Sequence, residues 1–446
     1  MRGMLLLAGL LVAAPAAAQQ LPQRLTLAEA LRIARANNPT YLQAVQAVEG
    51  AAARERQAWG RFLPSLSTSL SFRGVNRRSL TGQGDFGEVL ENPTYVEATT
   101  SSTSQGVSLG MTLFDGFGNL NTLRAERAGM RAVEAAAGAA EVQLRQDVLT
   151  AYYRARQAAR RLEVEEALLA SAREQLDMTE QRFEIGSANR EDVLGAQVTV
   201  ASREQAVLRA RGEVEKSQLE LFRVLGVRGE PGLTLVDDFP EVFDPSRLDA
   251  DALVAAAVAS SPRVLQRQAE ARAAELGAAA ARGSRWPTVS GNLSYGRSVG
   301  REGYGAFFEL DPPDENLAFE LSVRWPLFTG FQASAQIAQQ EVRAAAARQQ
   351  ARDERLAVET EVRQALVDLV NAYQAVELAD RALALSQERL ALTQERYRTG
   401  TSVTFLQLQS AIDQAANAEQ GAIDARFNFV MALVNLETKV GREVRP

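Results

Sequence analysis

Residues 317–327 read Leu-Ala-Phe-Glu-Leu-Ser-Val-Arg-Trp-Pro-Leu. Apolar residues occupy every second position up to Trp325, which is the period of a strand with one apolar and one polar face. Segments at about 65–73, 105–114 and 287–297 show a similar alternation. We therefore predict four strands of about ten residues, the length of a tilted membrane-spanning strand. Aromatic residues near the strand ends would form an interfacial girdle: Phe72, Trp286, Tyr295 and Trp325.

A soluble β-sandwich or hairpin pair with one buried face would give the same alternation. The predicted apolar faces are continuous, and their opposite faces carry serine, threonine and asparagine. Such a wall suits lipid on one side and water on the other.

The distribution of proline predicts long helices on either side of these strands. None of the 14 prolines lies between Pro93 and Pro231 or between Pro326 and Pro446. Proline breaks helix interiors, and these segments are rich in helix-forming residues with an apolar stripe every three or four positions. We predict long helices at about 119–183 and 331–397, with return helices at about 189–225 and 403–439.

The chain contains two copies of one structural unit. Pro64 and Pro287 are 223 residues apart (287 − 64), whereas Gly116 and Gly330 are 214 apart (330 − 116). Gly186 and Gly400 repeat the second offset. A loop between the proline and glycine landmarks is thus nine residues shorter in the second copy. We predict a first repeat at 19–226, a linker at 227–249 and a second repeat at 250–446. The Ser/Thr-rich segment 99–104, with 74–95 before it, is expected to be the longer loop, and 300–316 the shorter one.

Residues 1–18 have the pattern of a secretory signal peptide. Arg2 precedes a short apolar run, and Ala16-Ala17-Ala18 offers a cleavage site. The alternative, a helical membrane anchor, needs about 20 apolar residues. We therefore expect the chain to leave the cytoplasm.

The composition excludes several classes of function. With 0 His and 0 Cys, the chain has no catalytic triad, thiol nucleophile or zinc-thiolate site. A carboxylate-only enzyme would remain open, but no catalytic constellation is present, and pairs such as Asp237-Asp238 read as solvated linker charges. A net charge of −6 argues against nucleic-acid binding. We predict no enzymatic activity and no cofactor.

Four strands are too few to close a barrel. The smallest barrels need about eight strands, and an open strand edge is not tolerated in lipid. If the strands cross a membrane, several copies of the chain must assemble.

The ordered set of features resembles the TolC-like outer-membrane efflux protein family. It comprises a signal peptide, two repeats, paired strands between helices, and the turn motifs Arg182-Phe183-Glu184-Ile185-Gly186 and Arg396-Tyr397-Arg398-Thr399-Gly400. The resemblance extends from Leu25 to Gly441. It implies a mainly α fold with a small transmembrane β part. It also implies a homotrimer in outer-membrane lipid, with a 12-stranded β-barrel continuous with a 12-helix periplasmic tunnel. Such ducts serve drug efflux or secretion and dock to a periplasmic adaptor and an inner-membrane transporter.

The resemblance also implies two functional regions. The helical turns would contact the adaptor through Arg182, Ile185, Gly186, Ser187, Arg396, Thr399, Gly400 and Thr401. A pore constriction just inside the turns would involve Asp192, Phe405, Leu406 and Gln409. The family's best-known pattern has carboxylates at the positions of Leu406 and Gln409, and this chain lacks both. Asp192 has a second interpretation, as an acid in the capping box Asn189-x-x-Asp192.

One alternative belongs to a different class of protein. The helical hairpins would also suit a soluble periplasmic coiled-coil adaptor or scaffold with no pore. The four lipid-type strand faces distinguish the two hypotheses, since a scaffold has no use for them.

Overall fold

The structure, a computed structural model, describes residues 23–81, 94–305, 313–398 and 403–444. The predicted signal peptide therefore lies outside the described residues. The chain forms two compact units. The first consists of Met1–Ala47, Glu134–Leu265 and Asp353–Pro446, and the second of Val48–Val133 and Gln266–Arg352. The fold is mainly α with a small β part, as predicted.

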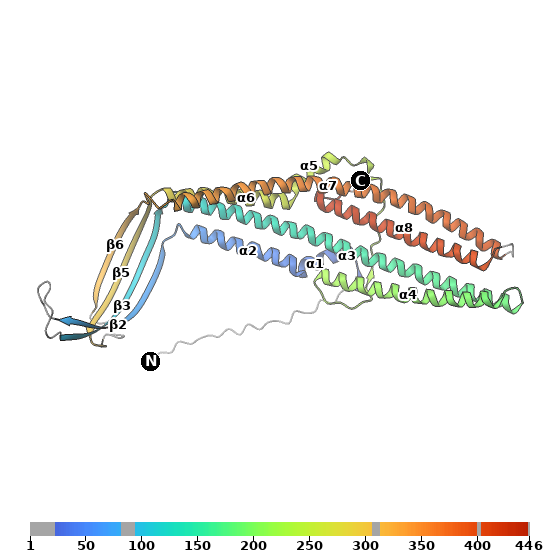
Figure 1. Ribbon diagram of the computed structural model, residues 1–446, viewed down its shortest axis with the longest axis horizontal. Helices are drawn as coiled ribbons and strands as arrows, with labels where there is room; N and C mark the ends of the chain where they lie inside the picture. The colour runs from blue at the N-terminus through green and yellow to red at the C-terminus, as the bar shows by residue number, and fades with distance from the viewer. Residues whose placement is uncertain (1–22, 82–93, 306–312, 399–402, 445–446) are drawn as a thin grey trace. The chain divides into compact units, whose positions relative to one another are not determined.

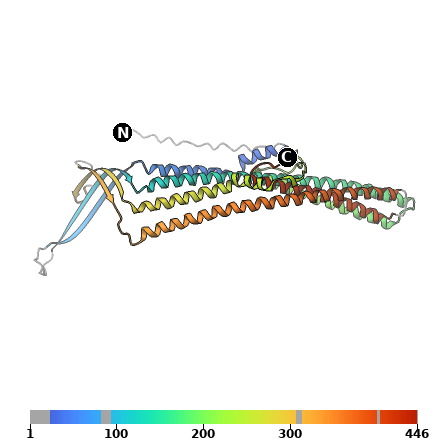
Figure 2. The same cartoon turned by 90° about the horizontal axis from the view of Figure 1, so that it is seen from above.

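Two helical hairpins form most of the first unit (Figure 2). Helix α3 (Gly118–Glu184) begins in the second unit and is followed by α4 (Arg190–Leu225). Helix α7 (Gln332–Arg398) is followed by α8 (Phe405–Val440). The long helices α3 and α7 both have 67 residues, and the return helices α4 and α8 both have 36. At 1.5 Å per residue, each long helix spans about 100 Å.

Short elements cover the hairpins of the first unit. Helix α1 (Leu27–Asn37) opens with the predicted capping box between Thr26 and Glu29. Strands β1 (Arg24–Leu25) and β4 (Thr234–Leu235) pair in parallel, and the 3₁₀ helix η1 (Pro245–Arg247) precedes α5 (Ala250–Ser260). Helices α2 (Pro39–Gly60) and α6 (Pro262–Arg282) run from the first unit into the second.

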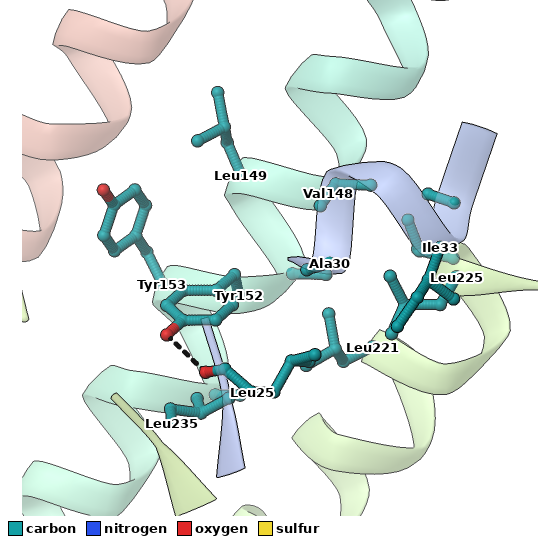
Figure 3. Close-up of a cluster of buried hydrophobic side chains, with 14 of the residues drawn as sticks. Leu25, Ala30, Ile33, Val148, Leu149, Tyr152, Tyr153, Leu221, Leu225 and Leu235 are labelled. Atoms are coloured by element: carbon teal, nitrogen blue, oxygen red, sulfur yellow. Dashed lines mark hydrogen bonds between the residues drawn. The ribbon is translucent and has the colours of Figure 1, made fainter. Parts of the chain in front are cut away.

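Tyr152 lies at the centre of an apolar core in the first unit (Figure 3). Its side chain is fully buried, and its hydroxyl donates to the Leu25 carbonyl at 3.1 Å. The same hydroxyl accepts from the Asp237 amide at 3.0 Å, while the Asp237 carboxylate accepts from the Leu27 amide at 2.6 Å. Burial, the largest cause, raises the pKa of Tyr152 to about 12. These bonds join α3, the first strand and the linker.

The prediction that Asp237 and Asp238 are solvated linker charges is wrong for Asp237. Asp238 is exposed, but it also forms ion pairs with Arg156 and Arg160. Asp237 is half-buried and bonded as above. Partial burial would raise the pKa of Asp238, but hydrogen bonds, first from Arg160, lower it below its usual value. Both carboxylates fasten the linker to α3, a role that composition alone does not reveal.

A four-stranded antiparallel sheet in the order β2-β3-β5-β6 dominates the second unit (Figure 1). Its strands are β2 (Ser65–Thr81), β3 (Thr94–Phe114), β5 (Thr288–Glu302) and β6 (Asp314–Arg324). A 3₁₀ helix, η2 (Gly283–Arg285), leads into β5. Gly116, at φ +68°, allows the turn after β3 to approach η2, because a Cβ there would lie 2.5 Å from the Gly283 carbonyl oxygen.

The first two strands are longer than the sequence predicts. Residues 74–81 and 94–104, expected to be loop, continue the ladder, and Asn76 pairs with Thr99. The Ser/Thr-rich segment was interpreted as loop because it is polar. Backbone pairing with the neighbouring strand holds these polar segments in the ladder, from Thr100 onward on both sides of β3, and threonine favours extended backbone. The shorter loop is likewise trimmed at both ends by β5 and β6.

Among the described helices, none has a stretch both long and apolar enough to cross a membrane.

Candidate functional site: the sheet faces and the helical turns

One face of the sheet is apolar and exposed. The strand register brings Leu109 opposite Leu66, and Leu293 opposite both Leu109 and Phe319. Phe319 is 74% exposed and Leu317 70%. Exposed apolar side chains on this face are Leu66, Leu70, Val107, Leu109, Met111, Leu293, Leu317, Phe319, Leu321 and Val323. A continuous exposed apolar face of this kind requires an apolar environment.

The opposite face of the sheet is lined by hydroxyls and glycines. Ser67 and Ser108 hydrogen-bond across β2 and β3 at 2.7 Å, and Ser290 and Ser322 do so across β5 and β6 at 2.8 Å. Gly106 and Gly296 are directly paired on the same face. Most side chains on this face are small and polar, and the outer strands add charged ones: Arg73 and Arg77 on β2, and Asp314, Glu320 and Arg324 on β6. The face is therefore suited to water.

The four predicted girdle residues are all exposed aromatic side chains. Trp286 and Trp325 lie next to the helical ends of β5 and β6, and the Trp325 indole donates to the Arg285 carbonyl at 3.2 Å. Phe72 and Tyr295 lie further along their strands, opposite Thr103 and Leu317. That the four side chains form a girdle remains a prediction.

The first helical turn is built as predicted. Gly186 has φ +74°, and a Cβ there would meet no atom within 4 Å. Backbone bonds to the Arg182 carbonyl from Ser187 (2.8 Å) and Ala188 (3.2 Å) close the turn. Ile185 is 78% exposed. The hydrogen-bonded turn therefore presents an exposed apolar side chain.

The C-terminal ends of α3 and α7 meet through a cation–π contact that the sequence did not predict. The Arg182 guanidinium lies over the Tyr397 ring, 4.7 Å from its centre, in a cation–π interaction. The predicted contact residue Arg396 is within α7, whereas Thr399, Gly400 and Thr401 lie outside the described residues.

The four predicted constriction residues fall into two groups. Asp192 forms the predicted capping box, accepting from the Asn189 amide at 3.3 Å, and Leu406 is 75% exposed. Phe405 instead packs toward α4, since a Cβ at Gly195 would lie 3.5 Å from its ring. Gln409 donates to Asp413 at 3.2 Å and lines a nearly filled space between α3, α4 and α8.

A polar cluster beside that space was missed by sequence reasoning. Arg203 on α4 forms an ion pair with Asp413 on α8 and lies 3.9 Å from Glu165 on α3. Gln420 donates to Glu165 at 2.5 Å. These groups join the two hairpins, but Arg203 and Asp413 are 210 residues apart, so no local pattern signals the pair.

Comparison with known proteins identifies the family. The model for outer membrane efflux proteins matches residues 30–227 and 253–442, most of the chain. The chain belongs to the outer membrane efflux protein family. The outer membrane is thus its location, and the family is described by efflux rather than by an enzymatic reaction.

Individual relatives agree with that assignment. The chain is 29% identical over 271 residues to Nodulation protein T of Rhizobium leguminosarum bv. trifolii, covering 59% of this chain and 54% of that protein. It thus spans about half the length of this relative. The outer-membrane channel OprN is similar in fold, with a TM-score of 0.75, 20% identity, and coverage of 93% of this chain and 89% of that one. CusC, described as forming a transmembrane channel, is also similar in fold. Its TM-score is 0.76 and its identity 20%, and the match covers 93% of this chain and 92% of that one.

Proposed function

We propose that this efflux protein is a passive exit duct for small molecules or secreted substrates. It couples to a periplasmic adaptor and an inner-membrane pump. The observation that carries the proposal is the two-faced sheet, apolar and exposed on one side and hydroxyl-lined on the other, attached to two long helical hairpins. The alternative, a soluble adaptor or scaffold, has no use for the exposed apolar face.

The proposed duct is a homotrimer. Strands β2 and β6 each pair on one side only within the described residues, so the sheet ends in two open edges. Three copies would supply 12 strands, enough for a barrel with a water-filled interior. On α7, Leu378, Leu385 and Leu392 repeat every seven residues and are each more than half exposed. Such a heptad seam is typical of helices that pack against a further helix.

The proposed mouth lies just inside the helical turns. Of the four predicted constriction residues, Leu406 and Asp192 are the ones whose side chains are not occupied between the hairpins. A threefold ring of each would give an apolar constriction and about three negative charges close together. Phe405 and Gln409 would then pack between the helices next to the mouth, without lining it.

The proposed adaptor surface is the pair of helical turns. Ile185 and Ser187 are exposed on the first turn. The predicted contact residues Thr399, Gly400 and Thr401 would add to the surface. A turn that presents an exposed apolar side chain suits docking against another helical hairpin.

Membrane extraction and conductance test the proposal together. The protein should remain in outer membranes through a high-salt wash, need detergent for release, and conduct ions in planar bilayers. Phe319→Asp, on the apolar face, should impair insertion, because a carboxylate that faces lipid is destabilising, although by less than the about 2–4 kcal/mol of an arginine or lysine. Ser322→Asp, on the hydroxyl face of the same strand, should insert normally. Release by salt, or equal insertion of both variants, would favour a scaffold.

A further inference from the structure

The two repeats define a strand register, which can be extended to the pairing between two copies of the chain. Adding 223 to residues of β2 and 214 to residues of β3 converts the first hairpin into the second. Leu66 paired with Leu109 becomes Val289 paired with Val323, and both pairs are observed. The sequence offsets therefore reproduce the strand register of the second hairpin, residue for residue.

The junction between the repeats supplies a template for the open edges. Within the chain, β3 of the first repeat pairs with β5 of the second, with Ser108 opposite Ser294 and Val107 opposite Tyr295. At a junction between two copies, β6 would take the place of β3 and the partner's β2 the place of β5. The same offsets then put Ser322 (108 + 214) opposite Ser71 of the partner subunit (294 − 223). They put Leu321 opposite the partner's Phe72.

Exposure differs between equivalent residues as this junction requires. Phe114, next to β5 in its own chain, is half-buried, whereas its equivalent Phe328 is 79% exposed. Gly116 lies against Gly283, whereas its equivalent Gly330, also at positive φ, has no atom within 4 Å of its Cβ position. The turn after β6 thus has the same positive-φ glycine as the turn after β3, but no segment of the described part of the chain packs against it.

Charge gives an independent argument for the same register. The polar face of β2 carries Arg73 and Arg77, and that of β6 carries Asp314 and Glu320; none has an ion-pair partner among the described residues. The offsets put Glu320 directly opposite the partner's Arg73. The equivalent pair inside the chain is Gly106 with Gly296.

The remaining charges fit this register too. Asp314 is diagonal to the partner's Arg77, within reach of a long side chain. Arg324, the other charge on this face of β6, lies opposite the partner's Ser69. Opposite charges thus stand across the junction between copies at a position where the junction within the chain has none.

We propose that β6 of one copy pairs antiparallel with β2 of the next, with Glu320 opposite Arg73 and Ser322 opposite Ser71 of the partner subunit. This seam rests on the proposed trimeric duct and specifies how it closes. The ion pair favours a second copy of this chain, in one register, over any other strand.

Disulfide mapping tests the register without background, because the chain has no cysteine. Ser322→Cys is combined in turn with Ser71→Cys, Ser69→Cys or Ser67→Cys, and detergent-purified trimers are oxidised mildly. The Ser71 combination should give covalent dimers and trimers on denaturing gels. The other two should give far less. Ser69 would be diagonal to Ser322, about 7–8 Å away, at the limit of disulfide reach of about 7 Å, and Ser67 lies two residues further along the strand.

Controls separate failure of the register from failure of the trimer. Within one chain the two cysteines are three strand spacings apart, about 14 Å, too far to react. Ser108→Cys with Ser294→Cys, the equivalent pair inside the chain, should oxidise without changing the oligomer. Fastest crosslinking by another combination, or none despite an intact trimer, would overturn the seam. A monodisperse monomer would overturn the trimeric duct as well.

A charge exchange provides the second readout. Arg73→Glu alone and Glu320→Arg alone should each lower the temperature at which the trimer dissociates in detergent, and the double variant should regain most of that loss. Arg324→Glu, which meets no opposite charge, should have a smaller effect. Failure of the double variant to recover would mean that the two residues do not face each other.

Discussion

At the scale of the residue, one hydroxyl group hydrogen-bonds several segments together in the core of the first unit. The Tyr152 phenol links the Leu25 carbonyl, the Asp237 amide and, through the Asp237 carboxylate, the start of α1. A buried group that loses a hydrogen-bond partner costs about 1–3 kcal/mol. This single side chain therefore joins the N-terminal strand and the inter-repeat linker to α3.

We expect Tyr152→Phe to lower the free energy of unfolding by about 1–3 kcal/mol, measured by urea denaturation followed by helical circular dichroism. Tyr41→Phe serves as the control, since its hydroxyl makes no hydrogen bond in the described part of the chain. Equal losses in both variants would mean that the hydrogen bonds do not contribute.

The same tyrosine predicts an alkaline limit. Folding raises its pKa from 10.0 to about 12. Its contribution is therefore complete below pH 10 and is lost as the pH rises through about 12. A titration should show the parent losing stability over this window, with a smaller loss in Tyr152→Phe. Identical curves would contradict the assignment.

Gly186 provides a second test at a single position. With φ at +74° and open space around it, a new side chain is strained by backbone conformation alone. Gly186→Val should cost about 1–2 kcal/mol locally and weaken adaptor binding. Gly186→Asn should retain most of the adaptor binding, because asparagine tolerates positive φ. Gly212→Val, in the middle of α4 with equally open space, should leave binding unchanged. Adaptor titration by surface plasmon resonance distinguishes these outcomes.

At the scale of the element, the hairpins are joined by charge as well as by apolar packing. Arg203 is 19% exposed in its side chain and faces Glu165, at 12%. Removing Arg203 would leave the Glu165 carboxylate buried without this positive charge, whereas Asp413, 46% exposed in its side chain, would be solvated. Exposed ion pairs contribute little. The position of an arginine on the helix thus matters more than the number of ion pairs.

Accordingly, Arg203→Leu should destabilise the helical unit by about 1–3 kcal/mol. Arg173→Leu removes the pair with Glu204, in which both side chains are more than half exposed, and should change stability by less than about 1 kcal/mol. Thermal unfolding of both variants in the same detergent makes the comparison. The argument fails if Arg173→Leu is the more damaging change.

At the scale of the whole molecule, symmetry multiplies single residues into rings. In the proposed trimer, Asp192→Asn should reduce cation preference in single-channel recordings, because about three charges leave the mouth. Folding should be little affected, since Asn keeps an oxygen for the Asn189 amide.

Leu406→Ala should instead raise conductance by widening an apolar constriction, with little change in ion preference. Gln409→Ala, behind the mouth, should change stability more than conductance. Parent-like conductance and selectivity in the Asp192 and Leu406 variants would place the constriction elsewhere.

The sequence by itself determined the features that depend on near neighbours. Proline-free segments gave the long helices to within one or two residues, and alternation gave the strand faces. The capping boxes and the turn at Gly186 follow from three or four adjacent residues. Each of these preferences is encoded within one or two turns of helix or a few strand positions.

Only the tertiary structure decided how these elements meet. Strand length exceeded the apolar pattern because backbone pairing continued through polar residues 94–104. Asp237 is a hydrogen-bond partner of Tyr152. The Phe405 side chain packs toward α4. Arg203 found its partner 210 residues away. Such contacts depend on which surfaces come together in space. A local sequence pattern does not show which residues far apart in the chain become neighbours.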